Sequence, residues 1–266
     1  MPGMAEGFVY VRDDRPGPMA GARVGARVRT PSWDPPWIVV DHELDGVIVA
    51  RWPGRLFRVA VVPPDSDEER LALARVERNR RTDVPYSRVF TVDVLAELPP
   101  GPLFGPHGDA VVEILEHARR LTEPAARELA AARHPDADRA YTRVWQRWLD
   151  TRPGGTRYRS HDHSRVLSIP GAGRPGSPVG NGLTVLWTCV TDSARRCAGA
   201  AAFAVDEESD EEYDEVLQDP WSTAGAALLD AAMARGAPDL VGPADAAVLT
   251  AAWQVVRRRP GRILRW

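Results

Sequence analysis

The chain has 266 residues, of which 44% are apolar and 27% are charged, as is typical of a globular protein. Its formal net charge of −3 argues weakly against a general nucleic-acid-binding function. All 34 Lys and Arg positions are Arg. Mechanisms that need a lysine amine, such as P-loop phosphate binding, protein-kinase catalysis and pyridoxal Schiff-base chemistry, are therefore excluded.

The missing lysine has two explanations. Ala, Arg, Gly, Pro and Val are abundant, and because GC-rich codons encode this set, a high-GC bacterial genome accounts for the bias. Selection for planar guanidinium groups that bind carboxylate or phosphate is the alternative. The two cysteines, Cys189 and Cys197, make no disulfide framework or metal motif, and residues 1–14 lack a signal-peptide pattern. We therefore expect a cytoplasmic protein.

The first hundred residues are predicted to be mainly β-structure. Short segments rich in Val, Ile, Phe and Trp alternate with turn residues, which favours strands at 8–11, 26–30, 37–43, 45–52 and 55–62. Tight turns at Asp45-Gly46 and Pro53-Gly54 predict an antiparallel meander over residues 37–62. A small SH3-like barrel or a strongly bent sheet fits this pattern best.

A helix and a further strand complete this region. Residues 66–69 match a capping box and predict a helix to about Arg81, with Leu71 and Ala74 buried and Leu73 as a further candidate for the same line. Residues 86–95 are predicted to form a strand that returns to the first sheet. The proline-rich segment 99–106 then marks a boundary.

The remainder is predicted to be mainly helical. Apolar periodicity and prolines at helix starts predict helices over 109–121, 124–133, 136–150, 220–235 and 243–259. Residues 165–169 and 183–190 are rich in Val, Leu and Thr and are predicted to be two strands joined by a Gly/Pro-rich loop.

These elements predict an α+β fold in two domains. Residues 1–100 form a β-rich, barrel-like domain with one helix. Residues 101–266 form a mainly helical domain with an inserted β-hairpin at about 165–190 and an acidic loop at 206–215. That loop, DEESDEEYDE, carries eight acidic residues and no basic one. It is either a solvated loop or an intramolecular clamp that pairs with a cluster of arginines.

His161, Asp162 and His163 form the densest group of titratable side chains. In a strand the two histidines would share one face and Asp162 the other, which is poor geometry for a metal. The other available ligands have no diagnostic spacing: His42, Glu43, Asp45 and His107. We expect no metal and no cofactor. A polar surface loop and an anion-binding or catalytic loop both remain open.

Residues 171–176 match the pattern G-x-G-x-x-G of dinucleotide-binding proteins. Only residues 177–182 separate them from the next predicted strand, so no crossover helix fits and the dinucleotide interpretation is rejected. A glycine-rich backbone can still approach a ligand closely. The predicted anion-binding residues are Arg157, Arg159, Arg165, Gly171, Gly173 and Arg174.

Trp33 and Trp37 flank the stiff segment Asp34-Pro35-Pro36. With Arg51, Trp52 and Arg55 they are predicted to form an aromatic and basic interaction surface, as SH3-like barrels use for peptides and some use for nucleic acid. The alternatives are that these tryptophans cap the core of the small barrel or that they dock against the C-terminal helices.

No recognisable catalytic motif remains, so we predict a cytoplasmic binding or protein-interaction module, and an enzyme is less favoured. One alternative is an enzyme that acts on a phosphate- or carboxylate-bearing small molecule through residues 161–163. The other is a nucleic-acid-binding accessory protein. The expected partner is a protein or a small anionic ligand and not a membrane, and a homodimer is compatible with the sequence.

Overall fold

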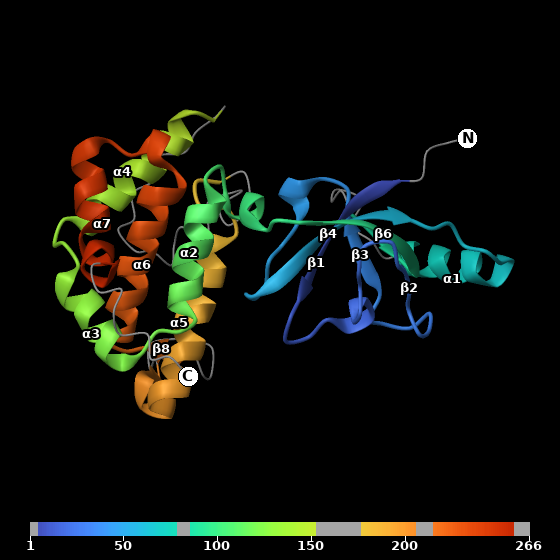
Figure 1. The fold of residues 1–266 in the computed structure, drawn as a ribbon, viewed down its shortest axis with the longest axis horizontal. Coiled ribbons are helices and arrows are strands. Elements are labelled where there is room, and N and C mark those ends of the chain that lie inside the picture. Colours follow the sequence, from blue (N-terminus) through green and yellow to red (C-terminus); the bar gives the residue numbers. More distant parts are fainter. Residues whose placement is uncertain (1–4, 79–85, 153–176, 206–214, 258–266) are drawn as a thin grey trace. The chain divides into compact units, whose positions relative to one another are not determined.

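The computed structural model describes residues 5–78, 86–152, 177–205 and 215–257. The chain divides into two compact units, residues 1–103 and 104–266, which we call the β unit and the helical unit. Figure 1 shows strands in the first unit and mostly helices in the second. The α+β class expected from the sequence is therefore confirmed.

The β unit is built on one antiparallel sheet, which has six strands among the described residues. The strands are β1 (Glu6–Arg12), β2 (Arg27–Arg29), β3 (Ile38–Asp41), β4 (Gly54–Val61), β5 (Tyr86–Val89) and β6 (Thr91–Leu98). Their order along the sheet is β2-β6-β4-β1-β3-β5. The longest pairings join β4 to β1 and to β6, so β4 lies at the centre. The segment predicted to return to the first sheet does so as β5 and β6.

One face of the sheet carries the core of the β unit. Apolar side chains alternate along the strands, so Val9 of β1 and Val59 of β4 belong to one buried cluster. Val89 of β5 is in the same cluster and Val28 of β2 packs against it, although these strands lie at opposite ends of the sheet. The sheet therefore curves around its core. The register shift between Arg58 and Val59 is a β-bulge, which increases local twist and bending.

The structure corrects two details of the predicted sheet. The meander over residues 37–62 is wrong, because β3 pairs with β1 and β5 and not with the segment that follows it. The strand at 45–52 is also wrong, because Leu44–Gly46 form a short 3-10 helix and residues 47–50 are not in a strand. Val47 and Val49 are buried while Ile48 is 61% exposed. The Val- and Ile-rich composition that predicted a strand therefore reflects packing onto the unit without strand pairing.

A closed barrel would require the two end strands of the sheet to pair with each other. Within the described part of the chain, no pairing joins the end strands β2 and β5. The SH3-like barrel therefore stays a prediction, and the curved antiparallel sheet is what the structure contains.

Helix α1 (Asp67–Arg78) follows β4 and begins with a variant of the predicted capping box. The Glu69 N–H donates to Ser66 Oγ at 3.1 Å, which satisfies one free amide of the first turn. The buried Glu69 carboxylate accepts the Asp65 N–H at 3.2 Å and pairs with Arg29 of β2 at 3.0 Å. These contacts fix the start of α1 to the sheet.

Two of the three positions of α1 that were predicted to be buried are exposed. Leu71 is 62% exposed and Ala74 also faces solvent, whereas Leu73 is partly buried. The helix instead shields Ala72 and Val76 in part from solvent, and both line a pocket described below. The prediction fails because a mostly charged helix offers several weak apolar lines, and tertiary packing selects among them.

The helical unit contains α2 (Gly108–Ala118), α3 (Glu123–Ala132), α4 (Ala137–Asp150), α5 (Gly182–Ala198), α6 (Trp221–Gly236) and α7 (Pro243–Arg257). The amphipathic pattern located α2 and α4 well. Their predicted core positions are buried: Val111, Ile114, Leu115, Ala118, Tyr141, Val144, Trp145 and Trp148. The predicted starts of α3, α6 and α7 at prolines lie within one residue of the observed ones.

Helix α6 is the centre of the helical unit. It contacts α2, α3, α4, α5 and α7, and residues 227–234 are buried without interruption. A helix that is apolar on all sides is expected in such a position. Gly225 allows α5 to approach, because a Cβ atom at this position would lie 2.7 Å from the Trp187 ring. Close helix contact here therefore depends on the absence of a side chain.

The predicted β-hairpin at about 165–190 is wrong in its second half. Residues 183–190 belong to α5, where Leu183, Leu186 and Val190 are buried at helical spacing. The β-branched and aromatic residues in this segment favour a strand by intrinsic preference. The segment nevertheless forms a helix, because its buried residues pack against α2 and α6. The first half, 165–169, lies outside the described residues.

The helical unit contains a two-stranded sheet that the sequence did not predict. β7 (Phe203–Val205) pairs antiparallel with β8 (Glu215–Leu217), so these strands flank the acidic run. Glu215, its last residue, forms an ion pair with Arg195 of α5. Residues 206–214 lie outside the described part of the chain, so the clamp stays a hypothesis.

Candidate functional site

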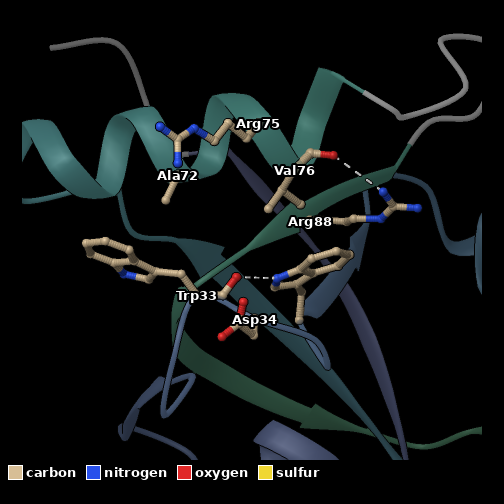
Figure 2. Close-up of a pocket in the computed structure, with 7 residues that line it drawn as sticks. Trp33, Asp34, Ala72, Arg75, Val76 and Arg88 are labelled. Atoms are coloured by element: carbon tan, nitrogen blue, oxygen red, sulfur yellow. Dashed lines mark hydrogen bonds between the residues drawn. The ribbon is translucent and has the colours of Figure 1, made fainter.

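A pocket of about 360 Å³ lies in the β unit between the loop before β3, helix α1 and strand β5. The loop contributes Trp33, Asp34 and Trp37 to its lining. The helix contributes Ala72, Arg75 and Val76, and β5 contributes Arg88. Figure 2 shows α1 on one side of the pocket and Trp33 and Asp34 on the other. Aromatic, aliphatic and charged groups therefore meet in one small volume.

The loop that carries the tryptophans is held by local contacts. Trp37 Nε1 donates to the Trp33 carbonyl at 2.8 Å, and the Asp34 N–H donates to Ser32 Oγ at 3.2 Å. Prolines within the loop restrict its φ angles further. The Trp33 ring lies 6.4 Å from the buried Phe90 ring, yet 41% of the residue is exposed. Trp33 is thus fixed at its backbone and open to contact on its ring.

Arg88 of β5 lines the pocket beside the tryptophan loop. Its guanidinium carbon lies 5.4 Å from the Trp37 ring centre and 5.8 Å from that of Tyr86, both within cation–π range. Its side chain also donates to the Val76 carbonyl at 3.5 Å, a long contact that Figure 2 marks. The Arg88 N–H donates to Glu77 Oε1 at 3.0 Å. Arg88 therefore joins α1, β5 and the tryptophan loop.

Arg75 differs from Arg88 because its guanidinium is not engaged. Within the described part of the chain, Arg75 makes no hydrogen bond or ion pair. The Asp34 carboxylate likewise has no recorded partner among those residues; only its backbone N–H is bonded. A cation and an anion therefore line the pocket with their hydrogen-bonding groups available.

The structure separates the predicted interaction surface into two parts. Trp33 and Trp37 line the pocket, whereas Arg51, Trp52 and Arg55 do not. Arg55 instead forms a two-pronged ion pair with Glu97, with distances of 2.8 and 2.5 Å. These hydrogen bonds hold the pKa of Glu97 below its usual value.

Sequence reasoning missed the basic groups of the pocket. Arg75 belongs to a helix in which most charges face solvent, and Arg88 belongs to a strand far along the chain. No local pattern distinguishes either residue from the other arginines. Only the pairing of β3 with β5, at the register Val39↔Arg88, brings Arg88 beside the tryptophan loop.

The predicted anion-binding and catalytic segment cannot be placed. Its residues all fall in 153–176, outside the described residues: Arg157, Arg159, His161, Asp162, His163, Arg165, Gly171, Gly173 and Arg174. Of the side chains considered as additional ligands, His42 contacts Ser87 Oγ at 2.7 Å and His107 lies 3.6 Å from Asp239. The described residues contain no group of three or more His, Cys, Asp or Glu side chains that could hold a metal.

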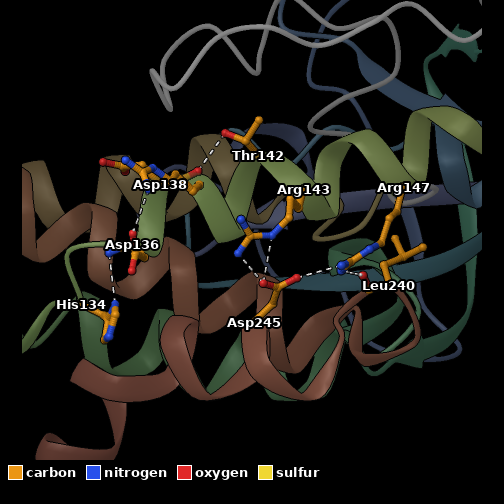
Figure 3. Close-up of polar contacts among 9 residues, drawn as sticks. His134, Asp136, Asp138, Thr142, Arg143, Arg147, Leu240 and Asp245 are labelled. Atoms are coloured by element: carbon orange, nitrogen blue, oxygen red, sulfur yellow. Dashed lines mark hydrogen bonds and ion pairs between the residues drawn. The ribbon is translucent and has the colours of Figure 1, made fainter.

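The helical unit carries a second polar cluster, shown in Figure 3, whose groups satisfy one another. Buried Asp245 of α7 accepts from Arg143 at 2.6 Å and from Arg147 at 2.9 Å. Arg147 also donates to the Leu240 carbonyl at 2.8 Å. The hydrogen bonds from Arg143, followed by those from Arg147, lower the pKa of Asp245. This cluster ties α4 to α7, so we interpret it as structural.

Buried Asp230 of α6 has a similar environment, since Arg133 Nε donates to its carboxylate at 2.8 Å. The same guanidinium bonds Asp138 of α4. A buried carboxylate needs such partners because an unpaired charge away from water is very costly. Both acidic groups of the helical core are therefore accounted for by packing and pairing.

No helix in the described ranges is both long and apolar enough to cross a membrane. Comparisons with models of protein families, with curated proteins and with solved structures found no match to this chain.

Proposed function

We propose that this protein is an interaction module whose β unit receives a short segment of a partner protein in the Trp33–Arg75 pocket. The observation that carries the proposal is that the exposed residue Trp33 lines the same pocket as the Arg75 guanidinium, which has no partner among the described residues. Trp and Arg are enriched among residues that dominate binding energy in protein interfaces. A rigid aromatic surface beside an available charge is what such an anchor site requires.

The size of the pocket supports a short segment as the ligand. Small-molecule sites usually measure about 300–1,000 Å³. At about 360 Å³, this pocket is at the lower end of that range and matches one or two side chains. An extended peptide could place such side chains in the pocket while the rest of the segment lies outside.

The curved antiparallel sheet also supports this function. SH3 domains bind extended peptides in grooves lined by aromatic side chains. In this β unit the loop before β3 brings Trp33 and Trp37 to a pocket beside α1 and β5. The SH3-like description and the peptide ligand are thus parts of the same proposal. A cytoplasmic location belongs to it too, and neither Cys189 nor Cys197 forms a disulfide bond within the described part of the chain.

Selection of peptides tests the proposal. A phage-displayed library of random heptapeptides would be selected on the full chain and, in parallel, on Trp33→Ala. Leu71→Ala is the matched control, because Leu71 is an exposed apolar residue of α1 that does not line the pocket. We expect the wild type and Leu71→Ala to enrich the same peptides and Trp33→Ala to lose them.

Two results would contradict the proposal. One is the absence of enrichment on the wild type, and the other is identical enrichment on Trp33→Ala. Titration of the same proteins with a single-stranded RNA homopolymer tests the nucleic-acid alternative. If the protein binds RNA and this binding is lost in Trp33→Ala, the ligand of the pocket is a nucleic acid and not a peptide.

A further inference from the structure

Several arginines of the β unit pair with carboxylates, and Arg75 differs from them. These pairs join Arg27 to Asp93, Arg29 to Asp65 and Glu69, Arg55 to Glu97, and Arg70 to Asp67. Arg75 has no such partner among the described residues, and it lies at the pocket. Its charge is therefore available to a ligand.

The pocket lining contains cationic, anionic and apolar groups. Figure 2 shows Arg75 on the helix side and Trp33 and Asp34 on the loop side. Val76 and the Trp37 ring supply further apolar surface. A ligand that uses all three kinds of group needs an anion for Arg75, an apolar body for Trp33 and a hydrogen-bond donor for Asp34.

We infer that the pocket selects an extended peptide segment in which an acidic residue lies next to an apolar residue, and that Arg75 recognises the acid. The carboxylate accepts two parallel hydrogen bonds from the Arg75 fork, a geometry that favours Arg over Lys. The apolar side chain packs on Trp33, and a backbone N–H of the segment donates to Asp34. This inference rests on the proposed function and specifies its ligand.

Charge favours this ligand over a nucleic acid. The lining has two guanidinium groups and one carboxylate, which leaves a local charge of only +1. Binding to nucleic acid draws most of its affinity from several phosphate contacts with cationic side chains. The Asp34 carboxylate would repel a phosphate backbone, whereas it suits a peptide N–H. A single acidic side chain matches the available charge.

A charge-reversal experiment tests the inference. Peptides enriched on the wild type would be titrated calorimetrically against the full chain, Arg75→Gln and Arg75→Glu. Arg70→Gln is the control, since Arg70 lies on the same helix but outside the pocket lining. We expect Arg75→Gln to weaken binding about tenfold, as loss of one charge-assisted contact would, and Arg70→Gln to leave the affinity unchanged. Thermal unfolding of each variant checks that the fold is retained.

The composition of the peptides gives an independent result. The wild type should enrich Asp or Glu beside an aromatic or aliphatic residue, and Arg75→Glu should enrich Lys or Arg at the same position. Peptides without acidic residues that still require Trp33 would overturn the inference while leaving the proposed function intact. Loss of Trp33 dependence would instead overturn the proposed function. Equal affinity of the wild type and Arg75→Gln for an acidic peptide would also overturn the inference.

Discussion

The guanidinium carbon of Arg88 lies 5.4 Å from the centre of the Trp37 ring. Trp37 is in turn bonded through its indole N–H to the Trp33 carbonyl. These two contacts connect β5 to the tryptophan loop, so the wall of the pocket is ordered before a ligand binds. Preorganisation of this kind lowers the entropy lost on binding.

Replacing Arg88 by Lys should loosen this wall. Lys keeps the charge but loses the planar stacking surface and the forked donors. We expect the free energy of unfolding to fall by about 0.5–1 kcal/mol, the size of a partly exposed cation–π contact. Urea unfolding followed by tryptophan fluorescence measures the change. Arg27→Lys is the control, because Arg27 pairs with Asp93 and contacts no aromatic ring within the described ranges. Equal effects of the two variants would contradict the role assigned to Arg88.

Gly225→Ala should destabilise the helical unit. In an exposed helix this change stabilises by up to about 1 kcal/mol. Here the new methyl group would lie 2.7 Å from the rigid Trp187 ring, so we expect a loss of about 1–3 kcal/mol from overpacking. In a Trp187→Leu background the penalty should shrink, because the flexible side chain can move away. A stabilising effect in the wild-type background would contradict the close packing of α5 on α6.

Asp245 should make the stability of the helical unit depend on acidic pH. Hydrogen bonds from Arg143 and Arg147 lower its pKa in the folded state, below the unfolded value of about 3.9. The ionised carboxylate therefore contributes its full share to the free energy of unfolding above the unfolded pKa. This contribution is lost as the pH falls through the lower pKa of the folded state. Asp245→Asn should cost about 1–2 kcal/mol at pH 7, less than a fully buried pair because both arginines are half exposed.

The measurement is the free energy of urea unfolding between pH 7 and pH 3. The difference between the wild type and Asp245→Asn should shrink as the pH decreases. Asp150→Asn serves as the control, because among the described residues the Asp150 carboxylate accepts a hydrogen bond only from the neutral Gln146 amide. Parallel pH curves for the wild type and Asp245→Asn would show that the carboxylate adds no pH-dependent stability.

His117 should contribute a second pH dependence at higher pH. Its ring packs edge-on against that of Trp253, with 5.3 Å between the ring centres. Burial lowers the pKa of His117, and the charge of Arg120 lowers it further. The unfolded pKa is about 6.5, so the protein is stabilised above this value and loses that stability as the pH falls towards the folded pKa. His117→Gln should flatten the stability curve between pH 7 and pH 5. An unchanged slope would mean that His117 is protonated as easily in the folded state as in the unfolded one.

The sequence predicted the helices of the second unit better than the sheet of the first. Val111, Ile114 and Leu115 repeat at helical spacing, and their burial depends mainly on that local pattern. The order of the strands depends on pairings between distant segments, such as β4 with β6, which no local pattern specifies. Residues 183–190 were misassigned because β-branched residues favour strands, whereas the buried residues Leu183, Leu186 and Val190 recur at the spacing of one helix face.

The site shows the same division. Trp33 and Trp37 are conspicuous in the sequence because they flank a stiff proline pair, and both line the pocket. Arg75 and Arg88 join them only through the folding of α1 and β5 beside this loop. Arg55, which the sequence suggested as their partner, is instead neutralised by Glu97. Tryptophan positions were therefore predictable, whereas the charges that face them required the tertiary structure.

The affinity of an enriched acidic peptide for Trp33→Ala, compared with the wild type, decides whether the pocket is a binding site. Loss of a tryptophan at the centre of an interface typically costs about 2 kcal/mol or more, so we expect binding to weaken about thirtyfold. Isothermal titration calorimetry on the full chain measures this difference, with Leu71→Ala expected to bind as the wild type does. Equal affinities for the wild type and Trp33→Ala would show that the peptide binds elsewhere and would contradict the proposed function.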